Sequence, residues 1–179
     1  KKISRNHSEI LLKKISADIK IKKLKKGNLI TLKGQKNLHA FNYTVNSDPS
    51  SAAFLIALTL LTPSAKLTIH NCLCNKNRMG FYKVLKEKAG ANIKIKNLRK
   101  SSESGELVGS IIARNSSLRA INWPKELIPS LIDELPILFI IAALTKGTSK
   151  FQQINEATKK ESNRIEEIRK ILIQIGIKC

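Results

Sequence analysis

The stretch Ala52–His70, AAFLIALTLLTPSAKLTIH, decides how this chain folds. An almost wholly apolar run is followed by Thr-Pro-Ser and then by alternating polar and apolar residues, which predicts a buried helix, a turn and a strand. The stretch Leu135–Ile154, LPILFIIAALTKGTSKFQQI, repeats this order about 83 residues later. Self-similarity at a fixed offset indicates a structural unit that is used more than once.

A second pattern interleaves with the first. Three amphipathic helices are predicted, and each ends at small residues before a run of alternating Ile and Lys. These helices cover His7–Ser16, Gly80–Lys88 and Glu161–Ile175. With further strands near Leu29–Leu32 and Leu107–Ala113, the order predicts βαβαββ-like units and an α/β or α+β fold. The chain begins and ends inside such units, so we expect it to be a segment of a longer enzyme.

The chain is strongly basic, with 33 basic and 13 acidic residues, a net charge of +20 and a pI near 10.1. Such a charge suits a protein that binds nucleic acid. Aromatic residues make up only 4% of the chain, however, so stacking platforms for bases are scarce. We therefore expect no nucleic-acid partner and attribute the charge to a general Lys/Ile/Asn bias. A basic nucleic-acid-binding module stays an alternative.

The cysteines and histidines do not have the spacing of a metal site. Cys72 and Cys74 have no second cysteine pair to complete a zinc site, and the three histidines are dispersed. The start of the chain has no apolar signal-peptide core, and the longest apolar runs are well short of the roughly 20 residues that span a bilayer. We therefore expect a cytoplasmic protein with reduced cysteines, no metal and no membrane partner.

Two cations and a carboxylate gather at the predicted start of the last helix, in KESNR at 160–164. Lys160, Glu161 and Arg164 share roughly one side of this helix. Arginine captures phosphate or carboxylate with paired hydrogen bonds, and a helix N-terminus adds free N–H groups. Glu161 between these cations is a candidate for proton transfer. The alternative is a solvated face with salt bridges, and the spacing alone favours that alternative.

Further candidates lie at the starts of two other predicted helices. Asp133 and Glu134 precede Pro136, which suits a first helical turn. They are either helix caps or carboxylates with a shifted pKa, one of which acts as a base, and the residues alone do not decide. Arg5 is either a surface arginine, the usual case, or a clamp for a phosphate.

Five motifs, in this order and at these spacings, resemble the 5-enolpyruvylshikimate-3-phosphate synthase (3-phosphoshikimate 1-carboxyvinyltransferase) family. Each motif alone is weak, but five in register are specific and cover essentially the whole chain. They are SRNHSE at 4–9, DPSSAA at 48–53, NKNRMG at 75–80, IDELPIL at 132–138 and KESNR at 160–164. The related UDP-N-acetylglucosamine enolpyruvyl transferase is the alternative, and its motifs around the corresponding acid look different.

The resemblance implies a two-domain enzyme of repeated βαβαββ units, an inside-out α/β barrel, with its active site between the domains. The enzyme would transfer the enolpyruvyl group of phosphoenolpyruvate to the 5-hydroxyl of shikimate 3-phosphate and release phosphate, without metal or organic cofactor. Residues 1–46 would end the first, shikimate-phosphate-binding domain, and residues 47–179 would form part of the second domain. We expect a monomer, and we expect residues 1–179 alone to be inactive.

The resemblance also implies which residues bind the two anionic substrates. Arg5 would contact the phosphate of shikimate 3-phosphate, and Lys160 would help to hold that substrate. Arg164 would bind phosphoenolpyruvate.

The same resemblance implies the residues that move protons. Asp133 would bind the shikimate hydroxyls and act as base toward the attacking one. Glu161 would exchange the proton at the phosphoenolpyruvate methylene. Asn163 and Asn6 stand where the family usually has Asp, so we expect a weaker orientation of the neighbouring arginines.

Overall fold

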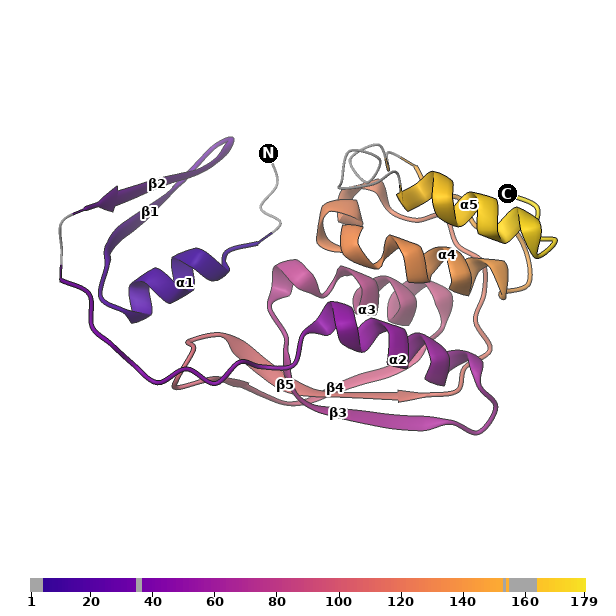
Figure 1. The fold of residues 1–179 in the computed structure, drawn as a ribbon, viewed down its shortest axis with the longest axis horizontal. Helices are drawn as coiled ribbons and strands as arrows, with labels where there is room; N and C mark the ends of the chain where they lie inside the picture. The colour runs from indigo at the N-terminus through magenta and orange to yellow at the C-terminus, as the bar shows by residue number, and fades with distance from the viewer. Residues whose placement is uncertain (1–4, 35–36, 153, 155–163) are drawn as a thin grey trace.

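A small N-terminal unit is joined by an extended segment to a larger unit of sheet and helices (Figure 1). The N-terminal unit contains α1 (His7–Lys14) and an antiparallel hairpin of β1 (Asp18–Leu24) and β2 (Gly27–Lys33). A two-stranded hairpin has little stability of its own, so this unit depends on its contacts with the rest of the chain. The structure is a computed structural model, and it describes residues 5–34, 37–152, 154 and 164–179.

A three-stranded antiparallel sheet forms the base of the larger unit. It consists of β3 (Lys66–Leu73), β4 (Asn92–Lys100) and β5 (Leu107–Arg114), with β5 between the other two strands. Ile111 at the centre of β5 is fully buried, and its partners on both neighbouring strands are also isoleucines. β4 is an outer strand, and all but one of its residues are exposed.

Both outer strands of this sheet contain a bulge. The register of β3 and β4 against β5 shifts close to Asn71 and Asn97, whose φ angles are 50° and 53°. Asparagine tolerates this left-handed backbone better than most residues, and a bulge bends its strand. Both bulges lie toward the end of the sheet that contacts the N-terminal unit.

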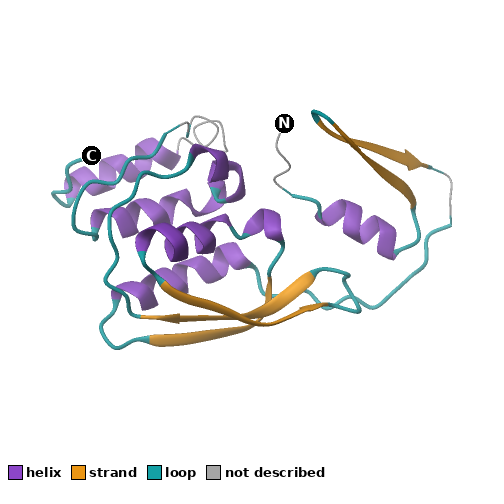
Figure 2. Cartoon of the chain, turned by 180° about the vertical axis from the view of Figure 1, so that it is seen from behind, coloured by secondary structure: helices purple, strands orange, loops and turns teal. Residues whose placement is uncertain are grey.

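Two helical segments cover one face of the sheet, as Figures 1 and 2 show. α2 (Pro49–Leu61) begins after Asp48, whose side chain caps the helix, and its proline occupies the first turn. α3 (Gly80–Val84) continues as a π-helical turn, η2 (Leu85–Ala89). The apolar run that predicted a buried helix is therefore α2.

The hydrophobic core lies between the sheet and these helices. Each large apolar side chain that is fully buried there stabilises the fold by about 1.5–3 kcal/mol. The largest include Ile56, Leu60, Phe81, Val84, Leu85 and Ile111.

A second helical layer packs on the first. It begins with two 3₁₀ turns, η3 (Lys125–Ser130) and η4 (Ile132–Glu134), and continues with α4 (Leu135–Ala143) and α5 (Arg164–Gln174). α4 contacts α2 on one side and α5 on another. Contact on more than one side explains why α4 is apolar almost all round.

Two isolated parallel bridges mark the expected repeat. Ser47 pairs with Cys72, and Asn122 pairs with Lys150. A helix, α2 or α4, lies between the two members of each bridge, which is the arrangement of a βαβ crossover. The strand expected over Lys150–Ile154 is limited to this one bridge in the described part of the chain. There the strands form two open sheets, and no described helix is long and apolar enough to cross a bilayer.

Candidate active site

Arg5 and Asp133 meet where the N-terminal unit approaches the helices of the larger unit. Arg5 precedes α1, and Asp133 lies in the turn η4. Nη2 of the Arg5 guanidinium donates a hydrogen bond to Oδ2 of Asp133, and the two groups form an ion pair. Their side chains are 39% and 26% exposed, so a ligand has access to both. The structure thus brings together two residues that the sequence nominated separately.

Glu134, the neighbour of Asp133, is buried and only 3% exposed. Its Oε1 accepts a hydrogen bond from the hydroxyl of Ser50. Burial raises the pKa of the Glu134 carboxyl above its usual value, although the Ser50 hydrogen bond and the Arg78 charge oppose that effect. Glu134 occupies the N-cap position of α4 but makes no capping hydrogen bond with its side chain. The helix-cap interpretation therefore does not hold for Glu134.

Arg78 extends this polar network toward the start of α2. Its Nη2 donates to Oδ1 of Asp48 at 2.8 Å and to Oγ of Ser50 at 2.5 Å. Burial raises the pKa of Asp48, but the hydrogen bonds from Ser51 and the Arg78 charge outweigh burial, so this pKa lies below its usual value. The contacts from Asp48 through Arg78 and Ser50 to Glu134 hold the start of α2 against the turn that carries Asp133.

Arg164, the first residue of α5, lies beside the same turn. It lines a small cavity together with Ile132 and Leu135, the two residues that flank the acidic pair of η4. Lys160 and Glu161 lie outside the described residues, as does Asn163, and the roles predicted for them stay predictions.

Asn6 is one of the two asparagines that stand where the resemblance leads us to expect aspartate. Its Oδ1 accepts hydrogen bonds from Nδ2 of Asn75 at 2.8 Å and from Nδ2 of Asn77 at 3.3 Å. An amide oxygen accepts these bonds as a carboxylate oxygen would. The carboxylate that pairs with Arg5 is Asp133, and the effect predicted for Asn6 on the orientation of Arg5 stays a prediction.

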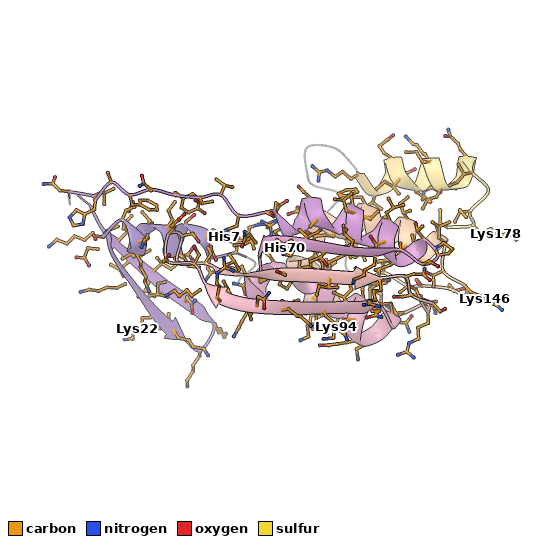
Figure 3. All side chains as sticks on the ribbon, turned by 90° about the horizontal axis from the view of Figure 1, so that it is seen from below. His7, Lys22, His70, Lys94, Lys146 and Lys178 are labelled. Atoms are coloured by element: carbon orange, nitrogen blue, oxygen red, sulfur yellow. The ribbon has the colours of Figure 1, made fainter. Side chains whose placement is uncertain are left out.

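A second buried carboxylate, Glu106, contacts His7, two residues after Arg5. Glu106 is 4% exposed at the end of the hairpin between β4 and β5. Its Oε1 is 2.6 Å from Nδ1 of His7, and its Oε2 accepts from Nδ2 of Asn75 at 3.1 Å. Figure 3 places His7 where the N-terminal unit meets the sheet. Sequence reasoning did not nominate Glu106, because an acid at the start of a strand carries no signal of a partner 99 positions away.

The arrangement combines cations with an accessible carboxylate. Arg5 and Arg164 suit anionic groups, and Asp133 is placed to accept a proton from a hydroxyl bound nearby. Cys72 is fully buried, and burial raises the pKa of its thiol to about 12, so the environment disfavours the thiolate that a nucleophile needs. Within the described residues, no group of three or more His, Cys, Asp or Glu is arranged to hold a metal ion.

The described lysines are spread over several elements, from the N-terminal hairpin to the end of the chain. Of the lysines labelled in Figure 3, Lys22 lies on the N-terminal hairpin and Lys94 on the sheet, whereas Lys146 and Lys178 lie at the far end of the larger unit. This dispersion agrees with a compositional bias better than with a groove that follows a nucleic-acid backbone.

Comparison with known proteins gives one consistent result. The family model for EPSP synthase (3-phosphoshikimate 1-carboxyvinyltransferase) matches residues 1–179. The 3-phosphoshikimate 1-carboxyvinyltransferase of Acidiphilium cryptum is 38% identical over 176 residues, which are 98% of this chain and 39% of that protein. The enzyme of the same name from Caldicellulosiruptor bescii is 38% identical over 177 residues, 98% of this chain and 40% of that protein.

The fold is similar as well. The 2.37 Å structure of EPSP synthase from Acinetobacter baumannii superposes with a TM-score of 0.87 and 32% identity, covering 99% of this chain and 39% of that one. This likeness confirms the fold expected from the repeated units. The chain spans about two-fifths of the length of the curated relatives that it matches.

Proposed function

Since this chain belongs to the EPSP synthase (3-phosphoshikimate 1-carboxyvinyltransferase) family, we propose that it forms part of an enzyme that transfers the enolpyruvyl group of phosphoenolpyruvate to shikimate 3-phosphate. The observation that carries the proposal is the pairing of Arg5 with Asp133 beside Arg164. Cations suit two phosphorylated substrates, and the carboxylate suits a hydroxyl that must lose its proton.

In the proposed reaction the 5-hydroxyl oxygen of shikimate 3-phosphate attacks C2 of phosphoenolpyruvate. Asp133 takes the hydroxyl proton, and a proton is added at the methylene carbon to give a tetrahedral intermediate. Loss of a proton from the new methyl group and of inorganic phosphate then restores the double bond. We assign the proton exchange at that carbon to Glu161, and the reaction needs no cofactor.

The binding roles follow the charges of the substrates. We assign the phosphate of shikimate 3-phosphate to Arg5, with Lys160 as a second contact to the same substrate. We assign phosphoenolpyruvate to Arg164. When shikimate 3-phosphate binds, its phosphate competes with Asp133 for the Arg5 guanidinium.

We propose that the domain boundary lies at residues 46/47. The described strands before it form only the hairpin of the N-terminal unit. At Ser47 the backbone joins the larger unit, because its N–H donates to Asn71 O at 3.1 Å and its carbonyl accepts from the Leu73 N–H at 2.9 Å. This division places Arg5 and Asp133 in different domains. We further propose a monomeric cytoplasmic enzyme.

The test is an assay of phosphate release from phosphoenolpyruvate by the full-length protein, with and without shikimate 3-phosphate. We expect release that requires shikimate 3-phosphate. A folded protein that releases no phosphate with both substrates present would contradict the proposal. Binding of a labelled oligonucleotide, measured over a range of salt concentrations, then tests the alternative of a basic nucleic-acid-binding module.

A further inference from the structure

Glu106 joins three segments of the chain that are distant in sequence. It directly precedes β5. Its side chain faces His7 at the start of α1 and accepts a hydrogen bond from Asn75 in the loop after β3. Its own backbone is fixed, since its N–H donates to Oγ of Ser104 at 3.2 Å and its carbonyl accepts from the N–H of Ser101 at 2.8 Å. A carboxylate held in this way is a rigid anchor.

The contact between Glu106 and His7 is strongly constrained. Glu106 is 4% exposed, and the 2.6 Å separation from Nδ1 of His7 is short for a hydrogen bond. The second ring nitrogen of His7, Nε2, is buried and has no hydrogen-bond partner in the described part of the chain. A buried carboxylate that loses its partner is costly, so this contact favours a single position for the start of α1.

Arg5 lies only two residues before His7, outside the helix. Asn6, between them, is held by Asn75 and Asn77. The segment that carries Arg5 is therefore tied to the larger unit by the two residues that follow it. The contact of Lys14 with the carbonyl of Ser102, at 2.6 Å, anchors only the far end of α1.

We propose that Glu106 and His7 are positioning residues for Arg5, which hold its guanidinium in front of Asp133 without touching a substrate themselves. The inference rests on the proposed function, because Arg5 is the contact assigned to shikimate 3-phosphate. Misplacement of a binding group by about 1 Å costs as much as about 100-fold in rate or affinity. Loss of His7 should therefore reproduce much of the loss of Arg5.

The first experiment is a kinetic double-mutant cycle in the full-length enzyme with His7→Ala and Arg5→Ala. We expect His7→Ala to raise KM for shikimate 3-phosphate about tenfold or more, with little change in KM for phosphoenolpyruvate. In the Arg5→Ala background, His7→Ala should add less than about twofold, because a residue that acts through Arg5 has no further effect once Arg5 is removed. His7→Asn, whose Nδ2 donates from nearly the place of Nδ1, should restore most of the affinity. Equal effects of His7→Ala in both backgrounds would overturn the proposal.

Glu106→Gln and Lys14→Ala complete the set of variants. Glu106→Gln keeps an acceptor oxygen for one neighbour, so we expect a smaller rise in KM than for Glu106→Ala. Lys14→Ala removes the contact of α1 with the carbonyl of Ser102, at the end of the helix far from Arg5. It should leave KM for shikimate 3-phosphate unchanged. A rise for Lys14→Ala equal to that for His7→Ala would show that any loosening of α1 suffices and would contradict a specific role for His7.

A second measurement needs no substrate and so separates this inference from the proposed function. The coupling between Arg5→Ala and Asp133→Asn is measured from melting temperatures, first with His7 present and then in the His7→Ala background. We expect the coupling to be lost when His7 is absent, whether or not the protein is active. Coupling that persists in His7→Ala would overturn the positioning role. Absence of phosphate release from the parent protein would count only against the proposed function.

Discussion

Arg5 and Asp133 stand 128 positions apart in the sequence and form an ion pair across the two units of the chain. The pair balances the charge of each partner while no substrate is bound. We propose that an anionic substrate that attracts the guanidinium weakens this pair, so that substrate binding changes the surroundings of the proposed base.

Asp133→Asn should largely abolish turnover while it weakens substrate binding only modestly. The amide keeps the shape and one acceptor oxygen but cannot take a proton, and general bases contribute about 100- to 10,000-fold to rates. Steady-state kinetics of the full-length enzyme measures kcat and both KM values. Asp18→Asn is the matched control. Asp18 lies on the N-terminal hairpin, opposite Lys33 in the register of β1 and β2. An unchanged kcat in Asp133→Asn would remove Asp133 from the base role.

Arg164→Ala should chiefly raise KM for phosphoenolpyruvate, by about 10- to 100-fold, since a charge-assisted contact with the substrate is lost. Arg164→Lys should recover only part of the affinity, because lysine cannot bind in the same bidentate way. Arg169→Ala is the control on the same helix, where Arg169 pairs with Glu166 at 2.8 Å on an exposed face. A normal KM for Arg164→Ala would assign Arg164 a structural role.

Glu134 should make stability depend on pH. Its pKa is raised by burial above the usual 4.5, so the native state keeps a proton that the unfolded state releases near pH 4.5. The free energy of unfolding should therefore fall as pH rises from about 4.5 through the native pKa and then level off. Glu134→Gln carries no titrating proton and should remove this fall, as denaturation at several pH values will show. A wild-type curve that rises in that window relative to Glu134→Gln would contradict the assignment.

Gly80→Ala should destabilise the protein by about 1–3 kcal/mol through overpacking. A Cβ at position 80 would lie 2.3 Å from Oγ and 2.8 Å from the carbonyl oxygen of Ser130, and the backbone atom has little room to move. Gly34→Ala is the matched control, because nothing lies within 4 Å of its added Cβ. The free energy of unfolding of Gly34→Ala should stay within about 0.5 kcal/mol of the parent. Equal effects of the two substitutions would show that the contact with Ser130 relaxes freely.

Several features could be predicted from the sequence because they are local. The apolar run of α2 and the repetition of helix and strand follow from periodicity and from the residues at the helix ends. Asp133 and Arg5 were nominated through motifs. Their mutual contact was not predicted, since nothing in the local sequence specifies a partner 128 positions away.

The polar network behind the site could not be predicted for the same reason. Ser50 and Glu134 are separated by 84 positions, and His7 and Glu106 by 99. Glu134 was considered as a cap because acids are frequent at helix starts, whereas burial against Ser50 decides its environment. The partners of Asn6, Asn75 and Asn77, are 69 and 71 positions away and could not be predicted either.

The exposed outer strand β4 bears on how separate copies of this protein behave in concentrated solution. An unpaired strand edge is a template on which another copy can add its own strand, and aggregation often starts in this way. Lys94, Lys96 and Lys100 lie along β4 and are exposed, so two such edges that approach each other bring like charges together. Part of the large positive charge thus acts as a barrier to self-association, and partial acetylation of these lysines would lower that barrier.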